Sequence, residues 1–361
     1  KVRDWAGIYD AQNLDSTIRY DYISLPVKAS DGSTYTETAM LGLPSDYSDN
    51  GEPVRLLVDC HGFSGGSFKF QTTYTWLQYY VHQGYAVVVI DGGGTIGAYN
   101  MGCPKAIDGH VAVYEYIAKN YNIKQDGVFV KGGSMGGITS LNLVCSGRIP
   151  VIAHIDECPV TDLFRQAYCR GWDPGNIKRI ANYYGFSFDK YNADHGTNYN
   201  LNTFPWTNKS QTISDAEREL YINNFVENVV PNNPIWKYMS CFDYETKTVK
   251  EGYEDFLTAT DEDRIAELWS TVTVDYPAPL AIYHGTGDAA VAYEYSKYLS
   301  DAINRSENSV CDLNTYNTTS HGNFGTKQNY TCKDGAVMNV YSGYDEMYQY
   351  MLEQEEIFEN K

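Results

Sequence analysis

The sequence predicts an α/β fold in which a mostly parallel central sheet carries helices on both faces. Short apolar runs typical of strands alternate with segments of helical periodicity, and a Gly-x-Ser-x-Gly pentapeptide joins one such run to one such segment. This alternation is typical of parallel sheets, because a crossover between parallel strands usually contains a helix. With 361 residues, 43% of them apolar, the chain is long enough for one large domain with an insertion.

The first half of the predicted sheet precedes the pentapeptide. Residues 17–43 alternate around Asp31-Gly32 and indicate an antiparallel hairpin. The runs at 55–60 and 85–90 are almost wholly apolar, as expected for buried parallel strands. Apolar spacing predicts helices over 70–83 and 108–120, and the strand at 127–130 leads into the pentapeptide.

The second half of the sheet is interrupted. A strand is predicted at 151–155, after which the alternation stops for about a hundred residues rich in Asn, Tyr and Trp. We predict an inserted, mainly helical cap over 157–272, with helices at 220–230 and 260–268, so that residues 1–156 and 273–361 form the main domain. A strand at 279–284, a helix at 292–303, a strand at 310–316 and a helix at 343–358 complete that domain.

The pentapeptide Gly132-Gly133-Ser134-Met135-Gly136 predicts a nucleophilic serine on a tight turn from strand to helix. The small residues Gly132 and Gly136 would let the strand and the helix approach each other closely. Three fixed residues in five recur by chance, so the alternative is a glycine-rich turn with an inert serine. Partners elsewhere in the chain are needed to distinguish the two.

A serine hydroxyl needs a base to accept its proton and an acid to orient that base. Asp288 follows the predicted strand at 279–284, and His321 follows the strand at 310–316. The order Ser134, Asp288, His321 is typical of hydrolases with a nucleophile on such a turn. We therefore predict Ser134 as the nucleophile, His321 as the base and Asp288 as the acid.

Other residues compete for these two roles. His284 lies in the turn before Asp288, and His61 lies at the end of an early strand, where a role in shaping the loop is more consistent with its position. Asp162 follows the strand at 151–155 and could reach a histidine in some arrangements of the sheet. We interpret Asp162 as a helix N-cap.

Two main-chain N–H groups are expected to stabilise the oxyanion of an acyl-transfer reaction. Met135 supplies the first, and Phe63 in the early glycine-rich loop supplies the second, with Ser64 as the alternative. We expect further substrate contacts from side chains of that loop and of the predicted cap, where aromatic rings can stack on sugar or phenolic rings. These side chains are His61, Ser64, Trp206 and Trp236.

Charge and cysteine content exclude several classes of function. The formal charge of −19 disfavours nucleic acids and anionic membranes as partners and favours neutral substrates, and no run of eighteen apolar residues occurs. The eight cysteines include no Cys-x-x-Cys pair, so we predict no metal; Cys311 and Cys332 could bridge, but free thiols are favoured. Gly92-Gly93-Gly94 lacks a phosphate-loop pattern, and no cofactor is predicted. The 33 tyrosines suggest a secreted protein that faces sugars, and the oligomeric state stays open.

Taken together, these motifs resemble the alpha/beta-hydrolase superfamily. The resemblance rests on His61-Gly62, the segment 132–137, Gly287-Asp288 and residues 320–322. Within the superfamily, the opening hairpin, residues 159–162 and the spacing from Asp288 to His321 resemble the prolyl-oligopeptidase-like branch, which contains peptidases and carbohydrate esterases. The resemblance implies an eight-stranded, mostly parallel sheet and a triad of Ser134, Asp288 and His321.

Three functions follow from this resemblance. We favour hydrolysis of a carbohydrate-linked ester of the acetyl or feruloyl type, because peptidases of the branch usually carry a large β-propeller, and only a few dozen residues here precede the first parallel strand. A serine peptidase is the first alternative; Asp156 and Glu157 could hold the free amine of a peptide. A non-catalytic protein that binds glycans or another protein is the second alternative, although it would not need all three triad groups.

Overall fold

The computed structural model describes residues 17–168, 174–207 and 213–361. Its centre is an eight-stranded sheet in the order β1-β2-β4-β3-β5-β6-β9-β10. The strands are β1 (Arg19–Lys28), β2 (Thr34–Leu43), β3 (Leu56–Cys60), β4 (Ala86–Ile90), β5 (Val128–Gly133), β6 (Val151–Glu157), β9 (Leu280–Gly285) and β10 (Cys311–Tyr316). The pairs β1–β2 and β2–β4 are antiparallel, and the remaining pairs are parallel, which confirms the predicted fold class.

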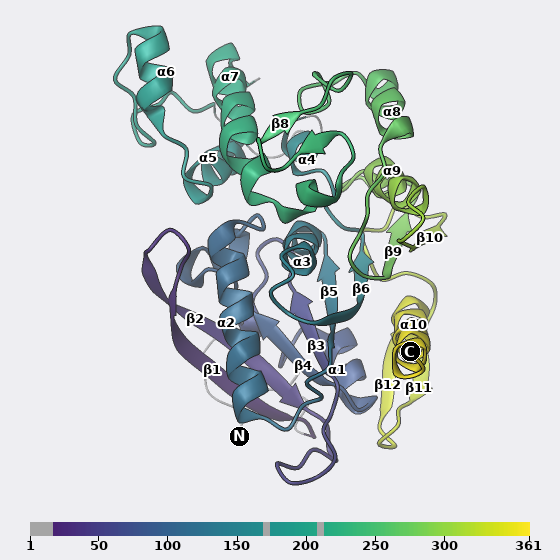
Figure 1. Cartoon of the computed structure of the whole chain (residues 1–361). Coiled ribbons are helices and arrows are strands. Elements are labelled where there is room, and N and C mark those ends of the chain that lie inside the picture. Colours follow the sequence, from purple (N-terminus) through teal and green to yellow (C-terminus); the bar gives the residue numbers. More distant parts are fainter. Residues whose placement is uncertain (1–16, 169–173, 208–212) are drawn as a thin grey trace.

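Helices cover both faces of the sheet (Figure 1). The helices of the main domain are α1 (Thr75–His82), α2 (Pro104–Asn120), α3 (Met135–Cys145), α9 (Tyr293–Asn304) and α10 (Ser342–Glu359). Buried side chains of α2, α3 and α9 belong to one apolar cluster, and those of α1 and α10 belong to a second. Alternate residues of β3 divide between the two clusters, as Val58 and Leu57 do, because successive side chains point to opposite faces of a strand.

The chain between β6 and β9 is mainly helical and lies beyond the ends of β5 and β6 (Figure 1). It contains α4 (Leu163–Tyr168), α5 (Pro174–Tyr183), α6 (Phe188–His195), α7 (Asp215–Asn224), α8 (Glu262–Thr271) and the short strands β7 (Phe242–Asp243) and β8 (Thr248–Val249). Side chains of α4, α5, α7 and α8 share the apolar cluster of α2 and α3. Because that core is continuous, the domain boundaries at 157 and 272 remain a prediction.

Several helix boundaries differ from those expected, and the differences at α1 and α7 are described here. The helix expected over 70–83 begins at Thr75. Residues Ser67–Lys69 form a separate short 3-10 turn, and residues 70–73 form turns that join it to the helix. The helix expected over 220–230 is α7, which begins at Asp215, where the Ser214 hydroxyl accepts a hydrogen bond from the Glu217 N–H, and is followed by a π-helical turn over Phe225–Val229.

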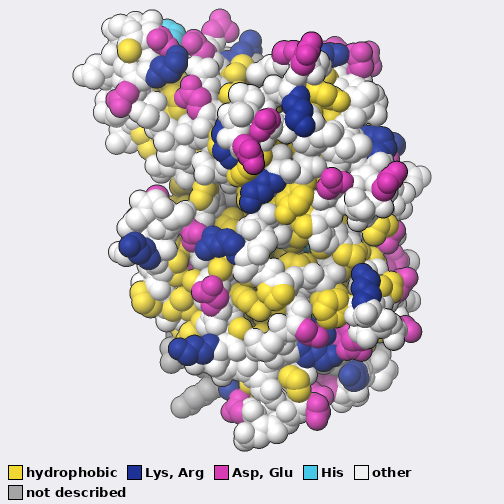
Figure 2. Space-filling view, viewed as in Figure 1, with side chains coloured by type: hydrophobic (Ala, Val, Ile, Leu, Met, Phe, Trp, Pro, Cys, Tyr) yellow, Lys and Arg dark blue, Asp and Glu magenta, His cyan; other side chains and the backbone are white. Residues whose placement is uncertain are grey.

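The described cysteines are all buried free thiols, including Cys311 and Cys332, which agrees with the favoured prediction; Cys169 lies outside the described residues. Among the described helices, none combines the length and apolar character that crossing a membrane requires. Acidic and basic side chains are interspersed over the face seen in Figure 2.

Candidate active site

Ser134 lies at the turn between β5 and α3. Its backbone has φ 53° and ψ −124°, a conformation that non-glycine residues seldom adopt. Hydrogen bonds hold the turn on both sides: the Ser134 N–H donates to the Glu157 carbonyl over 3.1 Å, and the Val160 N–H donates to the Ser134 carbonyl over 2.8 Å. Strained residues of this kind cluster at functional sites when the surrounding structure holds them in place.

The glycines of the pentapeptide allow neighbouring elements to pack closely around the turn. A Cβ on Gly136 would lie 1.9 Å from the Cys60 carbonyl oxygen at the end of β3. A Cβ on Gly132 would lie 2.3 Å from the Asp156 carboxylate and from the Ser140 hydroxyl. Any larger residue would therefore push α3 away from the sheet, as expected from the sequence.

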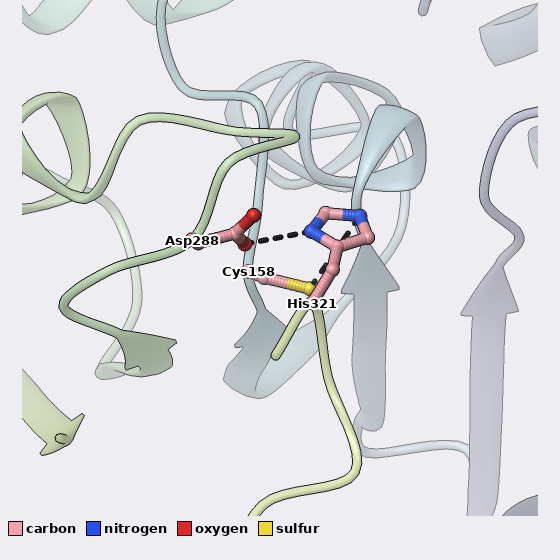
Figure 3. Close-up of side chains that lie close together, drawn as sticks. All are labelled: Cys158, Asp288 and His321. Carbon is pink, nitrogen blue, oxygen red and sulfur yellow. Dashed lines mark hydrogen bonds and ion pairs between the residues drawn. The ribbon is translucent and has the colours of Figure 1, made fainter. Parts of the chain in front are cut away.

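The structure brings His321 and Asp288 to Ser134. His321 follows β10 and Asp288 follows β9, and both loops lie at the end of the sheet where β5 ends. His321 Nε2 lies 2.9 Å from Ser134 Oγ. On the other side of the ring, His321 Nδ1 lies 2.6 Å from Asp288 Oδ2, and Figure 3 shows this pair. The three predicted residues thus form one hydrogen-bonded line.

Asp288 is held as a carboxylate. Burial favours its protonated form, but hydrogen bonds from His284 and His321, and the charge of His321, outweigh burial and lower the pKa of Asp288 well below its usual range. Its other oxygen accepts the N–H groups of Ala290 and Val291 over 2.8 and 3.1 Å. The carboxylate is therefore both ionised and fixed in orientation.

The competing residues have other partners. Asp162 accepts the Arg165 N–H over 3.0 Å at the start of α4, which agrees with its interpretation as a helix N-cap. His284 is buried, with Nδ1 2.8 Å from the Ser296 hydroxyl. His61 lies with its ring nitrogens 2.8 Å from the Gly62 carbonyl and 2.9 Å from the Asp91 carbonyl, so its ring is engaged in shaping the early loop.

An open cavity of about 250 Å³ adjoins Ser134 and His321. His61 and Phe63 of the early loop line it, and the Phe63 ring packs against Tyr99 with centroids 4.6 Å apart. Met135 is the first residue of α3, so its N–H is one of those that a helix leaves without an internal acceptor. Met135 follows Ser134 directly and Phe63 lines the same cavity as Ser134, and their roles as oxyanion donors stay predictions.

Ser64 does not fit the role of alternative oxyanion donor. Its N–H donates to the Ala98 carbonyl over 2.8 Å, and Ser64 is not among the residues that line the cavity. This bond already occupies the Ser64 N–H. The expected substrate contact of Ser64 is therefore not supported.

The two predicted tryptophans of the insertion also lie away from the cavity beside Ser134. Trp206 packs against Phe204 with ring centroids 4.7 Å apart, and its indole N–H donates to the Leu201 carbonyl. Trp236 packs edge-on against Phe242 and Phe256. Both rings stabilise the insertion's own core, and composition alone could not separate this role from substrate contact.

The cavity floor contains charged residues to which the sequence analysis gave little or no weight. Asp59 of β3, Lys131 of β5 and Glu157 of β6 are all at most 6% exposed and line the cavity. The sequence does contain a signal for two of them: Asp59 and Lys131 interrupt runs that are otherwise apolar. Aromatic side chains of Tyr74 and Trp76 form part of the wall.

Cys158, Asp288 and His321 place three potential metal-ligand atoms within 4.8 Å of one another (Figure 3). Burial raises the pKa of the Cys158 thiol well above its usual range, and the charges of Glu157 and Asp288 raise it further, which disfavours the thiolate that a metal requires. The His321 nitrogen nearest the sulfur, at 3.9 Å, also faces Ser134. The residues present fit a proton-transfer relay better than a metal site.

A family model described as X-Pro dipeptidyl-peptidase (S15 family) matches residues 27–251, more than half of the chain. The chain belongs to this S15 family. The matched region includes Ser134 and ends before Asp288 and His321.

One solved structure supports the fold of this S15 member, and a second is reported as similar. A candidate dipeptidyl aminopeptidase IV from Bacteroides ovatus is 14% identical, with a TM-score of 0.50 over 96% of this chain and 36% of that one. Est1E from Butyrivibrio proteoclasticus is 17% identical, with a TM-score of 0.44 over 92% of this chain and 98% of that one. A comparison with curated proteins found no match.

The chain spans about a third of the length of the Bacteroides ovatus protein. At this level of identity, the similarity concerns the fold alone. Family and fold together identify the chain as an alpha/beta-hydrolase of the serine-hydrolase type.

Proposed function

We propose that this protein hydrolyses carboxylic esters through an acyl-enzyme formed on Ser134. The observation that carries the proposal is the hydrogen-bonded line from Asp288 through His321 to Ser134, which opens onto a cavity of about 250 Å³. A nucleophile, a base and an orienting acid in this order are the parts that acyl transfer requires.

In the proposed reaction, Ser134 Oγ attacks the ester carbonyl while His321 Nε2 accepts the hydroxyl proton. The carbonyl oxygen becomes an oxyanion that the N–H groups of Met135 and Phe63 stabilise. His321 then gives its proton to the departing alcohol, and the C–O bond breaks to leave the acyl group on Ser134. Water activated by His321 releases the acid, and Asp288 stabilises the imidazolium in both halves of the reaction.

We further propose that the substrate is an ester of a carbohydrate, of the acetyl or feruloyl type. The rings of Tyr74 and Trp76 in the cavity wall supply apolar faces against which a sugar or phenolic ring can pack. A neutral glycan is also compatible with the strongly acidic chain, which carries a net charge of −19.

A serine peptidase is the second candidate, because the family that the chain belongs to is described as X-Pro dipeptidyl-peptidase. Glu157 lines the cavity and offers a carboxylate for the free amine of a peptide. Its Oε2, however, lies 3.7 Å from the Lys131 ammonium, which would repel that amine. This local charge favours the ester over the peptide.

The test measures hydrolysis of p-nitrophenyl acetate, methyl ferulate and an X-Pro p-nitroanilide by the wild-type protein and by Ser134→Ala. We expect turnover of the esters, lost by a factor on the order of 10⁴ to 10⁶ in Ser134→Ala. Ser146→Ala, at the other end of α3, is the matched control and should keep the wild-type rate.

Turnover of the anilide without the esters would overturn the esterase proposal in favour of the peptidase. Turnover that survives in Ser134→Ala would overturn the assignment of the nucleophile. If the wild-type protein hydrolyses none of the three substrates, the esterase proposal fails and a binding role becomes the leading hypothesis.

A further inference from the structure

Three charged side chains lie beside Ser134 at the ends of neighbouring strands. Asp59 of β3 lies opposite Lys131 of β5 in the sheet register, and Glu157 of β6 lies opposite Gly133. Their exposed fractions are 4%, 3% and 6%. Each of the three lies at a position where its strand would otherwise carry an apolar residue. Their side chains point to the face covered by α1 and α10, as do those of Leu57, Phe129 and Ile155, two residues earlier in each strand.

Burying three charged groups is costly unless each has a partner. Glu157 is well satisfied: its Oε1 accepts the Asn323 N–H over 2.9 Å and the Tyr344 hydroxyl over 3.1 Å, and its Oε2 lies 3.7 Å from Lys131 Nζ. Within the described part of the chain, the Asp59 carboxylate accepts no hydrogen bond, although Asp59 is 96% buried and lines the cavity. The Asp59 carboxylate can therefore accept a hydrogen bond from a group bound in the cavity.

The walls above this floor are aromatic. Trp76 stacks on Tyr344 with ring centroids 5.6 Å apart, and Tyr74 lies 5.0 Å from Trp76. Tyr74 and Tyr344 are buried and support Trp76, which is partly exposed. The ring of Trp76 can pack against the C–H face of a sugar while the charged groups of the floor bind its hydroxyls. Aromatic rings above buried charged groups are typical of a site for a polar ring, whereas a pocket for an acyl chain would be apolar throughout.

We propose that Asp59, Lys131 and Glu157 form a subsite that binds the hydroxyl groups of a sugar, and that this sugar is the leaving alcohol of the ester. A hydroxyl donates and accepts, so it can donate to either carboxylate and accept from the ammonium. A protonated primary amine can only donate, and its positive charge would face that of Lys131. This inference rests on the proposed esterase function and specifies its substrate.

The position of the subsite supports the assignment of the sugar as the leaving alcohol and not as the acyl group. His321, Gly322 and Asn323 line the same cavity, and Asn323 is bonded to Glu157. The base must return its proton to the leaving oxygen, so the alcohol lies next to the imidazole. The subsite therefore lies where that alcohol extends from the reacting carbon.

The first experiment uses the wild-type protein with p-nitrophenyl acetate as the reporter substrate. Methyl β-D-xylopyranoside should inhibit hydrolysis competitively, whereas ethanolamine at the same concentration should not. Inhibition by ethanolamine alone would overturn the subsite in favour of an amine site. Absence of inhibition by either compound would also overturn it.

The second experiment compares Asp59→Asn and Lys131→Met with wild type on an O-acetylated methyl xyloside and on p-nitrophenyl acetate. We expect kcat/KM to fall roughly ten- to a hundredfold for the sugar ester. The loss on p-nitrophenyl acetate, which carries no sugar, should be at least about tenfold smaller, so that the ratio of the two kcat/KM values changes.

Equal losses on both substrates in folded variants would overturn the subsite and leave the esterase function standing. Failure of the wild-type protein to hydrolyse p-nitrophenyl acetate would instead overturn the esterase function itself. Thermal unfolding of each variant separates lost recognition from lost folding. If Lys131→Met does not fold, the ratio of the two substrates in Asp59→Asn decides the question.

Discussion

Asp288 contacts two histidines, and this arrangement makes its charge the central electrostatic feature of the triad. Hydrogen bonds from His284 and His321 keep the pKa of Asp288 low despite its burial. A neutral amide at this position would occupy the same space, but it would neither stabilise the imidazolium nor select the tautomer in which Nε2 accepts the serine proton.

Asp288→Asn should therefore lower kcat on p-nitrophenyl acetate by roughly 10⁴-fold without unfolding the protein. Asp312→Asn on the neighbouring strand β10 is the control, since Asp312 is exposed, and its kcat should stay within about twofold of wild type. A loss below tenfold in Asp288→Asn would contradict the role of the carboxylate.

Burial also changes the pKa of Asp59. Desolvation raises the pKa of Asp59 from 3.8 to about 6, although the charges of Lys131 and His61 oppose the rise. The folded protein therefore holds a proton that the unfolded chain releases between about pH 4 and pH 6. Stability from this group is complete below the lower value and is lost as the pH rises through the upper one.

Replacing Asp59 with Asn removes that titration. Between pH 4 and pH 7.5, the variant should gain up to about 3 kcal/mol of unfolding free energy relative to wild type, from a shift of about two pH units. Urea unfolding at several pH values measures the difference. A difference that stays constant over this pH range would contradict the raised pKa of Asp59.

The turn between β5 and α3 depends on close packing of whole elements. The position of Gly136 is limited by backbone atoms of Cys60 and His61, which cannot rotate away as a side chain could. Gly133, three residues earlier, would place a Cβ 3.5 Å from the Glu157 carbonyl oxygen, an ordinary contact.

Gly136→Ala should destabilise the protein by about 3 kcal/mol or more, because α3 or the end of β3 must shift. Gly133→Ala is the matched control and should cost less than about 1 kcal/mol. Chemical denaturation measures both. Equal costs would show that the end of β3 accommodates the extra methyl group.

Besides the short pair β7–β8 in the insertion, a longer pair of strands was not predicted from the sequence. β11 (Lys327–Thr331) and β12 (Val337–Tyr341) form a separate antiparallel hairpin. Their side chains are mostly exposed, so they show no apolar alternation. The dipeptide Asp334-Gly335, with Gly335 at φ 89°, was the one local signal of the turn.

Contacts between distant parts of the chain join the C-terminal helix to the sheet. Arg55, 3% exposed, lies directly before β3, and its Nε lies 3.0 Å from Glu355 of α10. The same guanidinium donates to the Gly127 carbonyl over 2.8 Å at the start of β5. This buried group connects segments 300 residues apart.

Arg55→Met should lower the unfolding free energy by about 3 kcal/mol, because it leaves the buried Gly127 carbonyl without its donor and removes one of the two cationic partners of Glu355. Arg148→Met is the control, since Arg148 is 46% exposed and pairs with Asp108, and its cost should be below about 1 kcal/mol. Urea unfolding measures the unfolding free energy of both variants. Similar losses in the two would contradict the stabilising role of the buried Arg55.

Local patterns along the chain were sufficient to predict the fold class and to select the three residues that the structure brings together at the end of β5. Each of these rests on short-range information. Apolar strands, turn glycines and polar loops at strand ends are visible in sequence because neighbouring residues impose them. The catalytic role of the triad and the limits of the insertion remain predictions.

The residues that line the cavity could be identified only from the tertiary structure. Trp206 and Trp236 match the pattern of sugar-binding aromatics in sequence, yet they pack inside the insertion, whereas Tyr74 and Trp76 reach the cavity. Asp59, Lys131 and Glu157 come from three strands that become neighbours only through sheet pairing. Which side chains share a cavity depends on contacts between residues far apart in sequence, and local propensity carries no information about those contacts.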